Sequence, residues 1–364
     1  MHVVQGKGDL LGLLRRPDMP ARRGASKLID MAGPGESDYT RYDRDICARA
    51  QVWLRESAPK FRDKPWVLFV SLVAPHFPLT SLPEHFYRYP PAMIPLPKAY
   101  GDQAEPRHPY IEEYARTIPY NDHCKGEADV KRALAGYFGL VSLLDEHVGK
   151  IIKTLNDTGL SDNTRVLYTS EHGDNNGARR LWGKSTMYDE SAGVPMILAG
   201  PGVASGRVVN TVTSLIYVYP TVLEALGVKP EPLPHARSLF EIASHGDSDR
   251  TVVSEYHATG SSAAYFMLRT PRWKYVEHVR FGPQLFDMEL DPEELRDLAG
   301  DAAHAAVLAE CAAMLRTYCD PKTVDARAKA RQAEILCANG GEAVVIKRGD
   351  LPFSPPPGVN AAWS

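Results

Sequence analysis

The sequence predicts an α/β fold in which a parallel-type sheet is sandwiched by helices and a smaller antiparallel sheet with a helix follows. Between residues 43 and 227, short apolar runs alternate with amphipathic helical segments, which is typical of a parallel sheet covered on both faces. After residue 228, short segments of alternating polarity replace the apolar runs. We therefore expect one unit at 1–227 and a C-terminal subdomain with a tail at 228–364.

The first elements come before residue 125. Residues 1–35 are basic and glycine-rich and are expected to form a loop. The spacing of apolar residues predicts a helix over 43–57. The continuous apolar run 66–73 predicts a fully buried strand of a parallel sheet, stopped by Pro75. Residues 80–125 are rich in proline and aromatic residues and predict a long irregular excursion.

The aromatic residues of this excursion have two interpretations. They could line a pocket that stacks on an aryl group or cages a quaternary ammonium, or they could pack the loop against the rest of the protein. The residues concerned are Phe86, Tyr87, Tyr89, Tyr100, Tyr110 and Tyr114.

Four further elements complete the first unit. Apolar residues at three- and four-residue steps predict a helix over 137–155, ended by Gly159. Buried strands are expected at 164–170 and 194–202. A helix is expected at 214–227, with Pro220 near its start.

The C-terminal subdomain is expected to contain an antiparallel sheet, built from the segments "TVVSEYHA", "AAYFMLRT" and "RWKYVEHV". Asp291, Pro292 and Glu294 form the pattern of a helix start. A second helix is expected at 302–318, and a polar, proline-containing tail ends the chain.

Composition excludes several classes of protein. The net charge is −3, which gives no electrostatic reason to expect a nucleic acid or membrane partner. No run of 18 apolar residues and no convincing secretory signal is present. The five cysteines are odd in number and widely spaced, which favours free thiols in a reducing compartment. We expect a cytoplasmic location.

Polar residues of ligand type follow two of the expected strands. His76 follows the first, and Glu171, His172 and Asp174 follow the second. A carboxylate beside an imidazole can bind a divalent cation, and Lys184 could hold an anionic substrate. Together they suggest metal-assisted hydrolysis of an anionic ester. The alternatives are a structural His76, an Asp174 that only caps a turn, and a solvated Lys184.

Four ordered motifs carry a family resemblance. The segment "YTSEHGDNNGARRLWGKSTMYDESAGVPMILAGPGV" resembles the sulfatase family of the alkaline phosphatase superfamily, and so do "SLVAPHFP", "SLIYVYPTVLEALG" and "RWKYVEHVRFGPQLFDMELDPEELRDLA". The stretch "CDPKTVDARAKARQ" resembles the choline-sulfatase-like branch. The resemblance implies an alkaline-phosphatase-like fold, a small anionic sulfate ester as substrate, and a divalent metal such as calcium, manganese or magnesium.

The resemblance also assigns roles to residues. Glu171 and His172 match the family's metal-binding pair, with Glu in place of Asp. Lys184 matches the lysine that holds the sulfate group, and His76 matches the histidine that contacts the sulfate or the leaving group. A metal, Lys184 and a protonated or hydrogen-bond-donating His76 would together stabilise the charge on the sulfuryl oxygens.

Other family features are missing from the sequence. The family's nucleophile is a cysteine converted to formylglycine, and none of the five cysteines lies in its motif. The paired aspartates of the family's first strand are also absent. We therefore expect a truncated N-terminus that lacks the first strands.

Three hypotheses follow from this combination of features. The chain is a sulfatase with an incomplete sequence, inactive or impaired as it stands; a phosphonate or phosphodiester hydrolase of the same superfamily; or a non-catalytic pseudoenzyme or fragment. The tail over 320–357 suggests a role in subunit contacts and thus a homo-oligomer.

Overall fold

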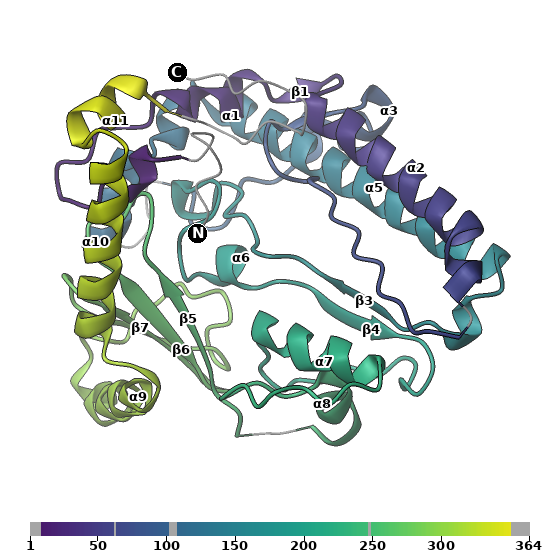
Figure 1. Cartoon of the computed structure of the whole chain (residues 1–364). Helices are drawn as coiled ribbons and strands as arrows, with labels where there is room; N and C mark the ends of the chain where they lie inside the picture. The colour runs from purple at the N-terminus through teal and green to yellow at the C-terminus, as the bar shows by residue number, and fades with distance from the viewer. Residues whose placement is uncertain (1–8, 62, 102–107, 247–248, 351–364) are drawn as a thin grey trace.

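The computed structural model describes residues 9–61, 63–101, 108–246 and 249–350. Its N-terminal part is built on two long helices that run side by side, α2 (Asp38–Glu56) and α5 (Glu127–Asp157) (Figure 1). The first helix starts ahead of the predicted range because Ser37 and Thr40 form a reciprocal capping box. Both predicted helices are therefore confirmed, each longer than expected.

Short elements join these helices to the rest of the chain. They are α1 (Lys27–Asp30), β1 (Gly33–Pro34), β2 (Thr80–Ser81), α3 (Pro83–Phe86), α4 (Pro109–Thr117), α6 (Asp189–Ala192), α7 (Val218–Ala225) and α8 (Leu239–His245). Strands β1 and β2 pair in parallel over two residues. The boundary predicted at residue 228 lies in the loop between α7 and α8 and stays a prediction.

The two strands predicted around the candidate site are present but antiparallel. Strand β3 (Val166–Thr169) pairs with β4 (Met196–Ala199) in the register Val166 to Ala199. The connecting residues 170–195 contain only a 3-10 turn, Ala178–Arg180, and the four-residue helix α6, and they return the chain along β3 in the opposite direction. Neither strand has a buried residue, and Ile197 is 58% exposed. The expectation of buried, parallel strands here was wrong.

The apolar run 66–73 is extended but does not pair with a strand in the described part of the chain. Its side chains alternate between exposed and half-buried, and Phe69 is 86% exposed. The prediction of a fully buried strand was therefore wrong. A continuous apolar run indicates burial only if both faces of the sheet are covered, and no strand of the described residues forms ladder hydrogen bonds with this segment.

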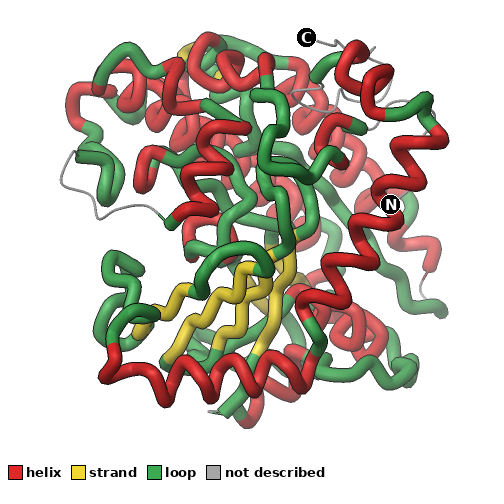
Figure 2. Tube along the Cα trace, turned by 90° about the vertical axis from the view of Figure 1, so that its left-hand side faces the viewer, coloured by secondary structure: helices red, strands yellow, loops and turns green. Residues whose placement is uncertain are grey.

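The antiparallel sheet predicted for the C-terminal part of the chain is confirmed. Strands β5 (Val252–Tyr256), β6 (Tyr265–Arg269), β7 (Trp273–His278) and β8 (Gln284–Asp287) form a four-stranded antiparallel sheet in sequence order. Helix α9 (Ala305–Tyr318) crosses the sheet and buries Cys311 and Leu315 against it (Figure 2). The central strands are almost wholly buried, because α9 covers one face. Helix α4 and the loop residues Leu181, Met187 and Tyr188 cover the other face.

The helix predicted to start at Asp291 is absent. Residues 291–300 form turns, in which the Asp291 carboxylate accepts hydrogen bonds from the backbone N–H groups of Leu295 and Arg296. Glu294 has a positive φ of 53° and is buried against Lys274. The residues of the capping pattern therefore form a turn and not a helix start. The Glu294 side chain instead forms an ion pair with Lys274, which is distant in sequence.

The tail after residue 319 is helical up to residue 348. Helices α10 (Pro321–Ala338) and α11 (Glu342–Arg348) pack against the N-terminal segment, where Arg15 forms a buried ion pair of 2.7 Å with Asp325. The part of the predicted tail after residue 350 lies outside the described residues. All five cysteines are free thiols, as expected. Among the described helices, none is both long and apolar enough for a bilayer span.

Candidate active site

A buried carboxylate fixes the start of the turn that carries His76. Asp43 of α2 accepts hydrogen bonds of 2.8 Å from the backbone N–H groups of both Val73 and Ala74. Its side chain is fully buried, and burial raises its pKa, while the two backbone hydrogen bonds oppose the rise. Asp43 therefore determines where the extended segment ends and the turn begins.

The His76 ring has a defined tautomer. Its Nδ1 atom lies 2.7 Å from the Phe77 carbonyl oxygen and therefore carries the proton. Its Nε2 atom lies 3.1 Å from Lys184 Nζ and accepts from the ammonium group. Burial, and then the charge of Lys184, lower the His76 pKa to about 4. In the free chain His76 is thus a neutral acceptor, and its expected protonated or donating role toward a bound sulfate group stays a prediction.

Lys184 lies at the end of a tight loop that Asp174 closes. The Asp174 Oδ1 atom accepts from the backbone N–H groups of Asn176 at 2.9 Å and Gly183 at 3.0 Å. Burial lowers the pKa of Lys184, and the charges of Asp174 and Glu171 oppose this effect. Asp174 therefore closes the turn, which agrees with the turn-capping alternative, and its charge acts on the ammonium group.

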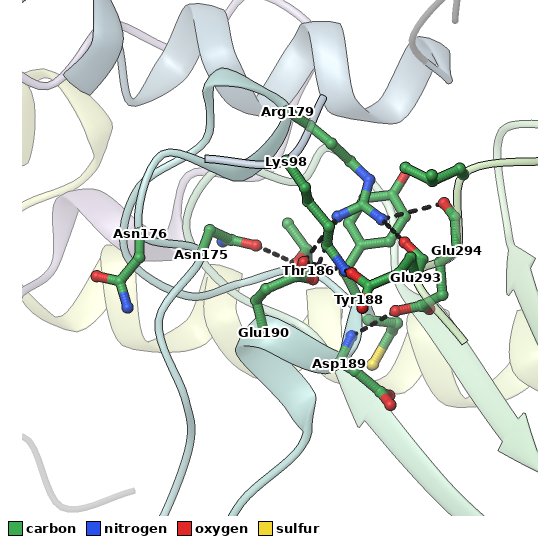
Figure 3. Close-up of polar contacts among 12 residues, drawn as sticks. Lys98, Asn175, Asn176, Arg179, Thr186, Tyr188, Asp189, Glu190, Glu293 and Glu294 are labelled. Atoms are coloured by element: carbon green, nitrogen blue, oxygen red, sulfur yellow. Dashed lines mark hydrogen bonds and ion pairs between the residues drawn. The ribbon is translucent and has the colours of Figure 1, made fainter. Parts of the chain in front are cut away.

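The middle of this loop is held by Arg179 (Figure 3). Its guanidinium group forms hydrogen bonds of 3.2 Å to both carboxylate oxygens of Glu190 and donates to the carbonyls of Glu293 and Glu294. It also lies 3.8 Å above the Tyr188 ring. Because Arg179 has a positive φ of 54°, these contacts hold a backbone conformation that is uncommon for a non-glycine residue.

Glu171 and His172 lie at the end of β3 and remain open to solvent. The Glu171 side chain is 79% exposed, and its Oε1 atom is 3.4 Å from His172 Nε2. His172 Nδ1 lies 2.7 Å from the Gly173 carbonyl oxygen, so the lone pair of Nε2 faces the carboxylate. An oxygen and a nitrogen lone pair that face each other suit a shared divalent cation. They supply two ligands, and the described residues contain no cluster of three or more.

The four predicted site residues therefore form one neighbourhood with two parts. His76 and Lys184 are in direct contact. The charges of Glu171 and His172 influence the pKa of His76, so the open pair lies within electrostatic range of the buried pair. The arrangement can bind an anion beside the ammonium group and a cation at the strand end.

Comparison with known proteins identifies the family. A family model described as "Sulfatase" matches residues 16–228, more than half of the chain. The chain belongs to the sulfatase family. A second family model, "N-sulphoglucosamine sulphohydrolase, C-terminal", matches residues 177–320 of this sulfatase-family chain.

Individual relatives agree with this assignment. A choline-sulfatase from Rhizobium meliloti (strain 1021) is 32% identical over 84% of this chain and 62% of its own length. An arylsulfatase K from Gallus gallus is 30% identical over 71% of this chain and 52% of its own length. The solved structure of a phosphonate monoester hydrolase from Silicibacter pomeroyi aligns with a TM-score of 0.64 and 28% identity, over 75% of this chain and 59% of that one. The sulfatase-family chain thus spans between half and two thirds of the length of each of these proteins.

Sequence reasoning missed three kinds of residue in this sulfatase-family site. Asp43 and Arg179 carry no local pattern that marks them. A set of buried tyrosines around Lys184 had a partial signal, since Tyr110 and Tyr114 are four residues apart and so share one face of a helix. Both rings are buried, so for these two aromatics loop packing was the better of the two interpretations.

Proposed function

We propose that this chain carries the part of a sulfate ester hydrolase site that binds the sulfuryl group. The observation that carries the proposal is the contact of 3.1 Å between Lys184 Nζ and His76 Nε2, beside the metal-type pair Glu171 and His172. Family membership and the choline-sulfatase and arylsulfatase K relatives support the choice of a sulfate ester.

The ammonium group of Lys184 provides the main attraction for the anion. It has three hydrogen-bond donors, and within the described residues only His76 Nε2 accepts from it. Two donors can therefore turn to sulfuryl oxygens. Its partial burial strengthens this attraction, because a charge–charge interaction grows as the local dielectric constant falls. A bound anion would also raise the pKa of His76 and favour a proton on Nε2.

Glu171 and His172 would hold the divalent metal that the family uses. The bound ion would supply positive charge next to the sulfuryl oxygens. In the free chain, the hydrogen bond from His172 Nδ1 to the Gly173 carbonyl keeps the ring in the orientation that points Nε2 at Glu171.

We propose further that the chain by itself binds a sulfate ester without hydrolysing it. None of the five cysteines lies in the family's nucleophile motif, and all five are free thiols. An assay with 4-nitrophenyl sulfate and choline sulfate, in buffers with calcium, manganese or magnesium, is expected to show no turnover. Turnover of either ester in any of these buffers would contradict this part of the proposal.

Binding of inorganic sulfate tests the site directly. In isothermal titration calorimetry, Lys184→Ala is expected to weaken sulfate binding at least about tenfold, because a charge-assisted hydrogen bond is lost. The matched control is Lys153→Ala, which removes an exposed lysine paired with Asp157 on α5. Equal affinities of the wild type and Lys184→Ala would refute the proposal.

A phosphonate or phosphodiester substrate is the second candidate. It is favoured by the solved phosphonate monoester hydrolase, which is 28% identical over the aligned residues. Phenyl sulfate and the monophenyl ester of a phosphonate differ in the central atom and in one substituent, so their affinities can be compared in the same titration. Tighter binding of the phosphonate ester would favour the second candidate over the first.

A further inference from the structure

Four tyrosines, three of them buried and one half-buried, converge on the loop that carries Lys184. Tyr110 and Tyr114 come from successive turns of α4, and Tyr256 and Tyr265 come from β5 and β6 of the C-terminal sheet. Tyr110, Tyr114 and Tyr265 have almost no exposed surface. Two parts of the chain that are far apart in sequence thus place phenol groups around one short segment.

The first contacts are made at the lysine itself. The Tyr114 hydroxyl lies 2.6 Å from the Lys184 carbonyl oxygen and 3.0 Å from the Trp182 carbonyl oxygen. Buried carbonyl groups need a hydrogen-bond donor, and the single Tyr114 hydroxyl hydrogen is shared between the carbonyl oxygens on the two sides of Gly183.

The next residue is held by the other three tyrosines. Tyr265 donates to the Ser185 carbonyl at 2.6 Å, and Tyr110 reaches the same oxygen and lies 2.6 Å from the Tyr265 hydroxyl. The Tyr256 hydroxyl lies 2.7 Å from Ser185 Oγ. Ser185 therefore has both its carbonyl and its side chain fixed from the side of the C-terminal sheet.

The backbone at this point needs such support. Gly183 has a φ of 69° and Ser185 a φ of 76°, and the left-handed region is disfavoured for a residue that has a Cβ atom. Because Lys184 lies between these two residues, the direction of its side chain depends on their conformation. A loop that relaxed toward ordinary dihedral angles would turn the ammonium group away from His76.

We propose that Tyr110, Tyr114, Tyr256 and Tyr265 are positioning residues that fix the Lys184 ammonium group against His76 for anion binding. The inference rests on the proposed function, in which Lys184 binds the sulfuryl group. It assigns to the C-terminal sheet a part in the anion site, although none of its side chains is expected to touch the substrate.

The ionisation of the tyrosines supports this role. Burial raises the pKa of Tyr256 to about 12 and those of the other three well above the usual value. All four phenols therefore stay protonated and remain able to donate throughout the physiological pH range.

A double-mutant cycle on sulfate binding tests the inference. Tyr114→Phe is expected to weaken sulfate binding about fivefold in the wild-type chain, because a hydrogen bond that orients Lys184 is lost. In the Lys184→Ala background the same change is expected to have no effect, since the tyrosine acts only through the lysine. A role limited to stability would weaken binding equally in both backgrounds.

Two further variants keep the test decisive. Tyr256→Phe removes only the contacts with Ser185 Oγ and Thr259. We expect it to lower the sulfate affinity two- to threefold in the wild-type chain and not at all in the Lys184→Ala background. This variant replaces Tyr114→Phe if Tyr114→Phe does not fold. Tyr275→Phe is the matched control, because Tyr275 is a buried tyrosine of the same sheet whose hydroxyl contacts Glu277. Its sulfate affinity is expected to equal that of the wild type.

The outcomes separate the two proposals. If Lys184→Ala binds sulfate as well as the wild type, the proposed function fails and the positioning role fails with it. If Lys184→Ala weakens binding while Tyr114→Phe and Tyr256→Phe do not, only the positioning role is overturned. An equal loss in Tyr275→Phe also overturns it, because any buried hydroxyl of the sheet would then have the same effect.

Discussion

The two sheets of this chain differ sharply in how completely they are covered. In the C-terminal sheet, β6 is buried along nearly its whole length, with α9 on one face and the candidate-site loops on the other. On the N-terminal side, β3 and β4 have no buried residue, and the extended segment 66–73 has no partner strand in the described residues.

The difference shows that the two halves of the candidate site are supported unequally. The Lys184 loop packs on the covered sheet and is held by Arg179 and the tyrosines. The His76 turn follows the uncovered segment, and Asp43 is the polar side chain that holds its start. Burial and hydrogen bonding set local stability, so we expect the His76 side to be the more easily disturbed.

The largest expected contrast is between two phenylalanines. Phe266→Ala is expected to lower the free energy of unfolding by about 3 to 5 kcal/mol, because Phe266 is 0% exposed and its removal leaves a cavity in the sheet. Phe69→Ala is expected to change it by less than about 0.5 kcal/mol, since Phe69 is 86% exposed. Urea unfolding measures both. A large loss in Phe69→Ala would show that segment 66–73 is covered in solution, and the comparison would fail.

The next effect concerns the ion pair that joins the covered sheet to the loop. The Lys274 ammonium group is buried between Asp189 and Glu294 and lies 2.6 Å from Glu294 Oε1. Lys274→Met is expected to cost about 3 kcal/mol, because the buried Glu294 carboxylate loses its cation. Lys153→Met, at an exposed lysine, is the control and is expected to cost less than about 1 kcal/mol. Similar losses in the two variants would contradict this account.

On the uncovered side, Asp43→Asn is expected to cost about 2 kcal/mol. A carboxylate accepts from both Val73 and Ala74, whereas an amide has one oxygen and leaves one buried N–H group without an acceptor. Amide hydrogen exchange is expected to accelerate at Val73 and Ala74 and to stay unchanged in β6. Unchanged exchange at Val73 and Ala74 would mean that something other than Asp43 holds the turn.

The last effect is a pH dependence that belongs to the covered sheet and reaches at most about 1.4 kcal/mol for each pH unit. Burial, and then the nearby His108, lower the pKa of His278 to about 3. The unfolded chain binds a proton near pH 6.5, so the unfolded state gains protons first as the pH falls. Stability is then lost below about pH 6.5 and down to about pH 3, by at most about 1.4 kcal/mol per pH unit.

His278→Gln is expected to flatten this slope in urea unfolding measured from pH 7 to pH 4. His245→Gln changes an exposed histidine of α8 and serves as the control. If both variants keep the wild-type slope, another group causes it.

The elements that could be predicted are those whose apolar sequence pattern agrees with the packing around them in the fold. The apolar spacing of α5 predicts both the helix and its buried face, and the alternation in β5, β6 and β7 predicts the strands, although β6 is buried on both faces. Segment 66–73 and the turn at Asp291 were mispredicted for the opposite reason. Burial of the former needs neighbouring strands, and the Glu294 side chain of the latter belongs to an ion pair with β7.

The candidate site divides in the same way. His76, Glu171, His172 and Lys184 could be proposed from the sequence because they lie in short motifs, and their roles stay predictions. The residues that hold them were not found, since a hydrogen bond such as that from Tyr265 to Ser185 joins positions 80 residues apart. No local pattern specifies such a contact, and only the folded chain reveals it.

The ion pair between Arg15 and Asp325 has a consequence for how the protein is made. The two residues are 310 positions apart, so at a synthesis rate of 5 to 20 residues per second Arg15 leaves the ribosome roughly 15 to 60 s before Asp325 exists. Throughout this interval the guanidinium group must stay hydrated, because burying it without its carboxylate is unfavourable. The N-terminal segment therefore stays solvated in the nascent chain and is among the last parts to adopt its native contacts.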